Sequence, residues 1–279
     1  MYSATSTSTR YGIESLDRRL AEGKATLTSA ELRKELGISA QATSNLLTRW
    51  RRAGLVDRVA QGRYAIRQIG LLGTRASSEG VALAVAALVG PHPHRIAYHS
   101  ALDFHGLLTR PVRTIQIASP RRFASTTVSG LPLRIVHEQG KTVKLGSEPA
   151  GHDALVSALE RALLDAASRP DLVGGYLPLA EALAASRPEP DRLLELARRL
   201  NANAALRRIG SLADRLELPE LAKALRPNGP TFDIDLDPGL KHLGTAFRDS
   251  DWRIRWPIDP SAVERRSRGD SPQSPQTPG

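Results

Sequence analysis

Polar and basic side chains gather between residues 39 and 64, and Asp57 is the single acid among them. Amide side chains pair bidentately with adenine, arginine pairs with guanine, and arginine also binds phosphates. The pattern therefore predicts contact with DNA, and it leaves open a solvated polar surface or a protein-docking module. The candidate residues are Ser39, Gln41, Thr43, Ser44, Asn45, Thr48, Arg49, Arg51, Arg52, Arg58, Arg63 and Tyr64.

Within this set, residues 40–53 form the predicted DNA-reading helix, and Ser39 is its expected N-cap. Gln41, Ser44, Thr48 and Arg51 fall near one helical face, which carries no acid that would repel phosphate. Arg51 and Arg52, near the end of the helix, are better placed for phosphates. Arg58 and Arg63 follow on a predicted hairpin, where they can reach the DNA backbone or minor groove with Tyr64 as support.

Other residues that suggest catalysis or metal binding have weaker patterns. Four histidines lie between residues 92 and 105, but no cysteine accompanies them, and His99 and His105 face different sides of a helix. Ser100, His99 and Asp103 lack the G-x-S-x-G turn of a hydrolase. We therefore predict no catalytic residue, no metal and no cofactor. Three alternating acids in residues 233–237 keep a metal-dependent enzyme as an alternative, namely Asp233, Asp235 and Asp237.

Two charged groups in the second half of the chain have structural and functional interpretations. Glu160, Arg161 and Asp165 lie on one predicted helix, where an ion pair that holds the domain together is favoured over acid–base chemistry. Arg207 and Arg208 are expected either to line a groove or to form a solvated helix face.

The elements that position the first group follow the order of a winged helix-turn-helix. Helical spacing occurs at residues 13–20, Thr28 or Ser29 caps a second helix with Glu31 in its first turn, and Gly37 ends that helix. After the third helix, residues 55–59 and 63–66 are predicted strands around a tight turn. Three helices followed by a hairpin predict a DNA-binding domain at residues 10–70.

The rest of the chain predicts a larger mixed domain at residues 81–260, after a linker at 71–80 and before a disordered tail at 261–279. The fold class is therefore α+β. Residues 81–90 are predicted to be a buried helix or strand. Helices are expected at 98–108, 155–166, 193–200 and 206–216, and strands at 114–118, 133–138, 142–145, 231–236 and 252–258.

Composition favours a soluble, cytoplasmic protein with an anionic partner. The chain has 279 residues, no cysteine, and a net charge of +10. Residues 1–70 hold 12 Lys or Arg against 6 Asp or Glu, so more than half of the excess charge lies in the first quarter of the chain. Neither a secretory signal nor a membrane-spanning stretch is evident, so we expect no membrane association.

Four short motifs in order behind the winged helix resemble the AbiEi antitoxin family over about residues 11–260. They are YHSALDFHGL at 98–107, SALERALLDAASRP at 157–170 with GG at 174–175, LRRIGSLAD at 206–214, and WRIRWPID at 252–259. The motif residues that carry the resemblance are Tyr98, Ser100, His105, Gly106, Glu160, Arg161, Asp165, Arg207 and Arg208.

The resemblance implies an antitoxin of a type IV toxin–antitoxin system of the kind linked to abortive infection and phage defence. Its winged helix would repress its own operon by binding inverted repeats in double-stranded operator DNA. Its second domain would counteract a nucleotidyltransferase toxin of the AbiEii type, with or without direct contact. The alternative is a solitary winged-helix regulator whose second domain binds a small molecule.

Overall fold

The computed structural model describes residues 4–22, 24, 26–67, 78–122, 124, 126–128, 130–227, 229 and 232–261. These residues belong to two compact units. The first unit comprises residues 1–96, 113–144 and 148–156, and the second comprises 97–112, 145–147 and 157–279. Most of the predicted linker and all but the first residue of the predicted tail lie outside the described residues.

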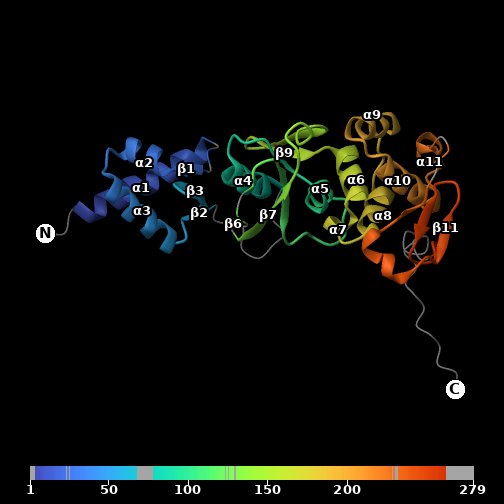
Figure 1. The fold of residues 1–279 in the computed structure, drawn as a ribbon. Helices are drawn as coiled ribbons and strands as arrows, with labels where there is room; N and C mark the ends of the chain where they lie inside the picture. Colours follow the sequence, from blue (N-terminus) through green and yellow to red (C-terminus); the bar gives the residue numbers. More distant parts are fainter. Residues whose placement is uncertain are drawn as a thin grey trace, which may run out of the picture. The chain divides into compact units, whose positions relative to one another are not determined.

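The winged helix in the first unit consists of three helices and a small antiparallel sheet (Figure 1). Its elements are α1 (Ala4–Ala21), β1 (Thr26–Thr28), α2 (Ser29–Leu36), α3 (Ala40–Arg52), β2 (Val56–Ala60) and β3 (Arg63–Ile66). The sheet has the order β1-β3-β2, so β1 pairs with β3 and adds a strand to the predicted hairpin. The helix α1 begins nine residues before the predicted start at residue 13.

Local capping defines the ends of α2 and α3. Thr28 and Glu31 form a capping box, in which the Thr28 hydroxyl accepts from the Glu31 amide and the Glu31 carboxylate accepts from the Thr28 amide. Gly37 has φ of 62°, a left-handed conformation that ends α2. The Ser39 hydroxyl then caps α3 by accepting from the Ala42 amide at 3.2 Å. The predicted caps of both helices are therefore confirmed.

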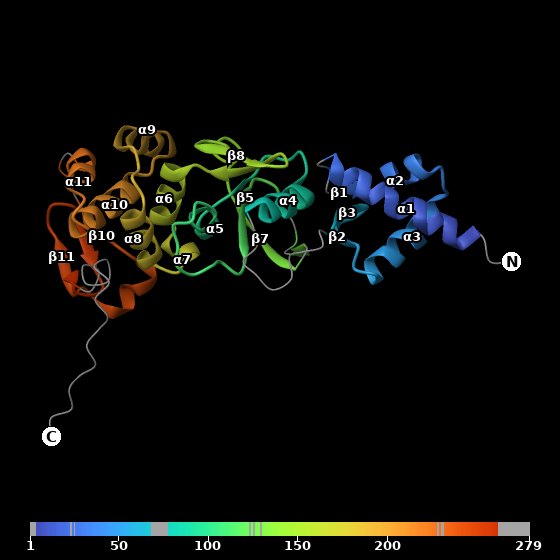
Figure 2. The same cartoon turned by 180° about the vertical axis from the view of Figure 1, so that it is seen from behind.

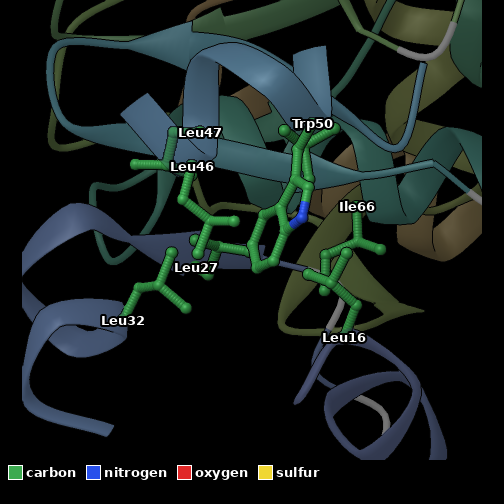
Figure 3. Close-up of a cluster of buried hydrophobic side chains, with 8 residues drawn as sticks. Leu16, Leu27, Leu32, Leu46, Leu47, Trp50 and Ile66 are labelled. Carbon is green, nitrogen blue, oxygen red and sulfur yellow. The ribbon is translucent and has the colours of Figure 1, made fainter. Parts of the chain in front are cut away.

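A hydrophobic core joins all three helices of the winged helix to its sheet. Trp50 of α3 lies among Leu16 of α1, Leu27 of β1 and Ile66 of β3 (Figure 3). Leu32, Leu46, Leu47 and Val56 complete the buried cluster. Because these apolar residues occupy one side of α3, its polar residues are left on the opposite, solvent-facing side.

A six-stranded mixed sheet forms the rest of the first unit, with strand order β6-β7-β5-β4-β9-β8. The central β5 is parallel to β7 and antiparallel to β4, and β4 is parallel to β9. The strands are β4 (Arg95–Ile96), β5 (Ile115–Ser119), β6 (Thr126–Val128), β7 (Leu131–His137), β8 (Ser147–Gly151) and β9 (Ala154–Ser157). The buried segment at residues 81–90 is helical, as α4 (Ser78–Val89).

The second unit is mainly helical, and its helices α6, α8 and α10 pack side by side (Figures 1 and 2). A three-stranded sheet of order β10-β12-β11 belongs to the same unit. The helices are α5 (His99–Phe104), α6 (Leu159–Ser168), α7 (Pro170–Val173), α8 (Tyr176–Ala185), α9 (Pro190–Leu200), α10 (Asn203–Arg215), α11 (Pro219–Leu225) and the 3-10 helix η1 (Pro238–Leu243). The strands are β10 (Ile234–Asp235), β11 (Phe247–Asp249) and β12 (Ile254–Trp256).

One predicted strand is wrong, and one predicted helix begins later than expected. Residues 142–145, predicted as a strand, lie in turns. There the carbonyl of the buried Val143 accepts from Arg95 Nη1 at 2.7 Å, so a side chain satisfies it instead of a neighbouring strand. The predicted helix at 155–166 begins only at Leu159, because Leu155 lies in β9.

Among the described residues, no helix has both the length and the apolar character that crossing a membrane requires.

Candidate nucleic-acid interface

The solvent-facing side of α3 carries most of the predicted DNA-contacting residues. Seven of them are exposed, namely Gln41, Ser44, Asn45, Thr48, Arg49, Arg51 and Arg52. The helix contains neither Asp nor Glu, so no carboxylate on it opposes an anion. A duplex major groove admits a single α-helix, and this face offers amide, hydroxyl and guanidinium groups to it.

The three arginines of α3 are available for ionic contacts. Within the described part of the chain, the side chains of Arg49, Arg51 and Arg52 form no ion pair or hydrogen bond. The side chain of Arg58 on β2 is exposed and likewise forms no ion pair or hydrogen bond with the described residues. Four cationic side chains without internal partners can therefore neutralise phosphates at no cost of breaking internal contacts.

The amide groups of α3 are arranged for base recognition. Gln41 Nε2 donates to Asn45 Oδ1 at 3.2 Å, one helical turn away. Both side chains are exposed, so this hydrogen bond can exchange for hydrogen bonds to bases. Ser39, also exposed, uses its hydroxyl to cap α3 and leaves the helix N-terminus facing solvent.

Three predicted contact residues have other roles in this structure. Thr43 is only 3% exposed, and its hydroxyl donates to the Ser39 carbonyl at 2.9 Å, so it packs inside the domain and cannot reach a base. Arg63 is half-buried, and its Nη1 donates to the carbonyl of Leu88 at the end of α4 at 3.3 Å. Tyr64 is also half-buried and packs against the hydrophobic core of the winged helix.

The motif residues of the second unit form its internal polar framework. Arg161 Nε donates to Asp165 at 2.7 Å, and Arg161 Nη1 donates to the Leu145 carbonyl at 2.6 Å. Asp165 also accepts from Ser157, and the buried Glu160 accepts from the Glu189 amide at 3.1 Å. These carboxylates therefore bind groups of the protein itself, as the structural interpretation predicts.

The first motif begins at a strained residue and contacts the second. Tyr98 is buried with φ of 54° and ψ of −132°, a conformation that non-glycine residues rarely adopt. Ser100 is buried as well, and Gly106 ends the segment with φ of 72°. His105 Nε2 lies 2.7 Å from the carbonyl of Ser157, so these two motifs meet directly.

Arg207 and Arg208 are buried and bind backbone carbonyls, which corrects both interpretations of them. They are 7% and 8% exposed. Arg207 donates to the carbonyls of Trp252, Phe232 and Arg253, and Arg208 donates to those of Asp235 and Ala167, all within 2.9 Å. Burial lowers the pKa of both guanidinium groups, and the backbone carbonyls take the place of water around them.

The acids that suggested an enzyme are engaged with arginines and a backbone amide. Asp233 forms ion pairs with Arg248 and Arg253, and Asp235 forms one with Arg255 at 2.7 Å. Asp237 accepts from the Gly239 amide and caps η1. Within the described ranges, no three His, Asp or Glu side chains come together as metal ligands.

Comparison with known proteins supports the assignment of the first domain. The model of the MarR family matches residues 18–63, which span α2, α3 and most of the hairpin. None of the curated proteins matches the chain. A solved structure, that of the RV2827C protein from Mycobacterium tuberculosis, is similar with a TM-score of 0.67 and 18% identity, covering 94% of this chain and 95% of that one. At this identity the likeness establishes the fold alone.

The geometry of α3 and the family match together lead to one conclusion. The chain carries a winged helix-turn-helix DNA-binding domain of the transcription-regulator type at its N-terminal end, followed by a larger mixed α/β region.

Proposed function

We propose that this chain is an autorepressor and the antitoxin of a type IV toxin–antitoxin system. The observation that carries the DNA-binding part is the acid-free, exposed face of α3, whose three arginines form no ion pair with any residue that the structure describes. The antitoxin part rests on the resemblance of the four motifs to the AbiEi family. The proposal requires no catalytic step in this chain.

In this proposal α3 enters the major groove of operator DNA. Gln41 and Asn45 contact base edges, while Arg49, Arg51 and Arg52 bind phosphates. Arg58 on β2 binds the adjacent backbone. An inverted repeat has two half-sites, so two copies of the chain bind each operator.

The antitoxin role belongs to the rest of the chain, opposite a nucleotidyltransferase toxin encoded nearby. Since most of the motif residues are buried and bind groups of the second unit itself, they offer little surface to the toxin or its product. Exposed residues between the motifs are the candidates for that surface.

An electrophoretic mobility shift with the chain's own upstream DNA at several salt concentrations tests the DNA-binding part. The variant Arg49→Ala/Arg51→Ala removes two phosphate contacts. It should therefore bind more weakly and lower the slope of log K against log salt by about 2. The matched control is Arg198→Ala/Arg199→Ala, which removes the same charge from exposed positions on α9 and should bind like the wild type. Equal weakening of both variants would contradict the assignment of α3.

Co-expression with the neighbouring gene tests the antitoxin part separately. If that gene is toxic, both the wild type and the DNA-binding variant should relieve the toxicity in a plasmid system with a foreign promoter. Failure of both to do so, together with specific DNA binding, would leave a solitary winged-helix regulator as the function.

A further inference from the structure

We propose that a cavity of about 700 Å³ in the second unit binds a small molecule with an apolar body and one hydrogen-bond-donating head, most simply a primary amine. This volume lies in the range of small-molecule sites, which are mostly apolar with a few converging polar groups. The inference is independent of the proposed function, because it concerns no DNA or toxin contact.

One face of α8 forms the main wall of the cavity. Leu177, Ala180, Glu181, Ala184 and Ala185 recur at helical spacing and all border the cavity. The opposite face of α8 is buried through Leu179, Ala182 and Leu183. Since the cavity face carries alanines where larger side chains would fill the space, α8 leaves room for a ligand.

The other walls come from the segment after α5, the end of α7 and the residue that follows α10. Leu108 follows α5, Val173 ends α7, and Leu216 follows α10. These are apolar side chains, so an apolar body gains stabilisation by leaving water against them.

A carboxylate and an imidazole border this apolar space. Glu181 is the single charged residue of α8, and it lies on the cavity face, where it accepts from the backbone amide of Thr109. His99 borders the same space, and burial lowers its pKa, which favours the uncharged imidazole. The neighbouring carboxylate of Asp103 adds negative potential at His99. Donor groups, and cations above all, therefore match this end of the cavity.

Arg110 also borders the cavity, but its environment differs from that of Glu181 and His99. Arg110 is exposed, whereas Glu181 and His99 are half-buried. Water screens an exposed guanidinium, so Arg110 attracts an anionic head less than Glu181 attracts a donor head.

The position of His99 is set by a strained backbone. The preceding residue, Tyr98, has the positive φ described above, and His99 is the first residue of α5. Strain of this kind persists where the surroundings enforce it, and it concentrates at ligand-binding sites.

The test is calorimetric titration of the full chain, without DNA, with three probes of one shape: 2-phenylethylamine, 2-phenylethanol and phenylacetate. We expect the amine to bind best, the alcohol more weakly and the carboxylate not at all up to 10 mM, a concentration chosen as about the weakest affinity that such fragments show. Phenylacetate binding as tightly as the amine would overturn the assignment of the head group. No binding by any probe would overturn the site.

Two variants locate the site. Glu181→Gln keeps an acceptor for the Thr109 amide and removes the charge, so it should weaken amine binding about tenfold and leave 2-phenylethanol unchanged within a factor of about three. Ala184→Phe should fill the cavity and abolish binding of both probes. The matched control is Ala204→Phe, at an exposed position in the first turn of α10, which should bind like the wild type. Retained binding in a folded Ala184→Phe variant, verified by circular dichroism, would contradict the location.

Discussion

At the scale of single residues, the buried arginines of the second unit donate mainly to backbone carbonyls and less to carboxylates. Arg207 and Arg208 bind five carbonyl groups between them, and Arg161 binds one carbonyl and one carboxylate. Arginine suits this role because its fixed fork of five donors can satisfy several acceptors at once. Carbonyls of α6, β10 and the turn before β12 thereby keep a donor inside the protein.

Arg161→Met should be strongly destabilising for the same reason. The substitution removes the Arg161 guanidinium from the buried Asp165 carboxylate and deprives the Leu145 carbonyl of a donor. Removal of one partner from a buried pair costs about 3–5 kcal/mol. Urea unfolding followed by circular dichroism measures this loss. The control is Arg199→Met, whose ion pair with Glu195 is exposed and should contribute less than about 0.5 kcal/mol. Similar losses in the two variants would contradict the role assigned to Arg161.

At the scale of elements, capping and turn residues close in sequence predicted the helices and hairpin of the winged helix. Strand pairing between residues far apart in the sequence was not predicted. The caps at Thr28 and Ser39 depend on neighbours within three residues, so their sequence patterns are sufficient. The strand β1 has three residues, and its strand character comes from pairing with β3 some 37 positions away. Leu155 matched a helical spacing by chance, because β9 is almost wholly buried and lacks the alternation that marks a strand.

Two of the resemblance motifs contact each other in the structure, although they are far apart in the sequence. The segment LRRIGSLAD lies on α10, and WRIRWPID includes β12. Ser211 accepts from Trp256 Nε1 at 3.0 Å and donates to Asp249 at 2.7 Å, while Asp214 accepts from Trp252 Nε1. Two fully buried tryptophans are thus anchored by one face of α10. No spacing within either motif predicts that the two segments touch.

Gly210→Ala on α10 should reverse the usual effect of this substitution. In an exposed helix interior, replacing glycine with alanine stabilises by about 1 kcal/mol. At Gly210 the added Cβ would overlap the ring of Trp252, so the helix or the ring must shift. Overpacking of this kind costs about 1–3 kcal/mol, and we expect a net loss of stability in urea. The control Ala204→Gly, in the exposed first turn of α10, should cost about 1 kcal/mol or less. A stabilised Gly210→Ala variant would show that Trp252 does not lie against the glycine.

At the scale of the whole molecule, charge and cavity differ in how far the sequence reveals them. The excess of positive charge in the first quarter of the chain is a property of composition, and the fold places part of it on the exposed face of α3. The cavity beside α8 depends on packing. The sequence YLPLAEALAA is apolar on almost every side and gives no sign that one face of the helix borders a space.

Each compact unit also contains a histidine whose pKa burial lowers from the usual 6.5: His94 in the first and His99 in the second. Below pH 6.5 the unfolded chain therefore binds more protons than the folded one, so acidification favours unfolding. Glu35 affects stability at a lower pH than the two histidines do. Burial raises the pKa of Glu35, but the hydrogen bonds and charge from Ser15 and Arg19 lower it by more, so the net pKa is below the usual 4.5. The stability that Glu35 contributes is therefore lost only as the pH falls below about 4.5.

The free energy of unfolding should consequently fall between pH 6.5 and pH 5, by up to about 1.4 kcal/mol per pH unit for each histidine. Thermal or urea unfolding of His94→Gln and His99→Gln at several pH values measures this. Each variant should show a flatter profile than the wild type, because a neutral amide takes up no proton on unfolding. The control is the exposed pair His137→Gln/His242→Gln, which should leave the profile unchanged. If the His94 and His99 variants run parallel to the wild type from pH 6.5 to 5, the acid sensitivity has another origin, and the two imidazoles then have the same pKa in the folded and the unfolded chain.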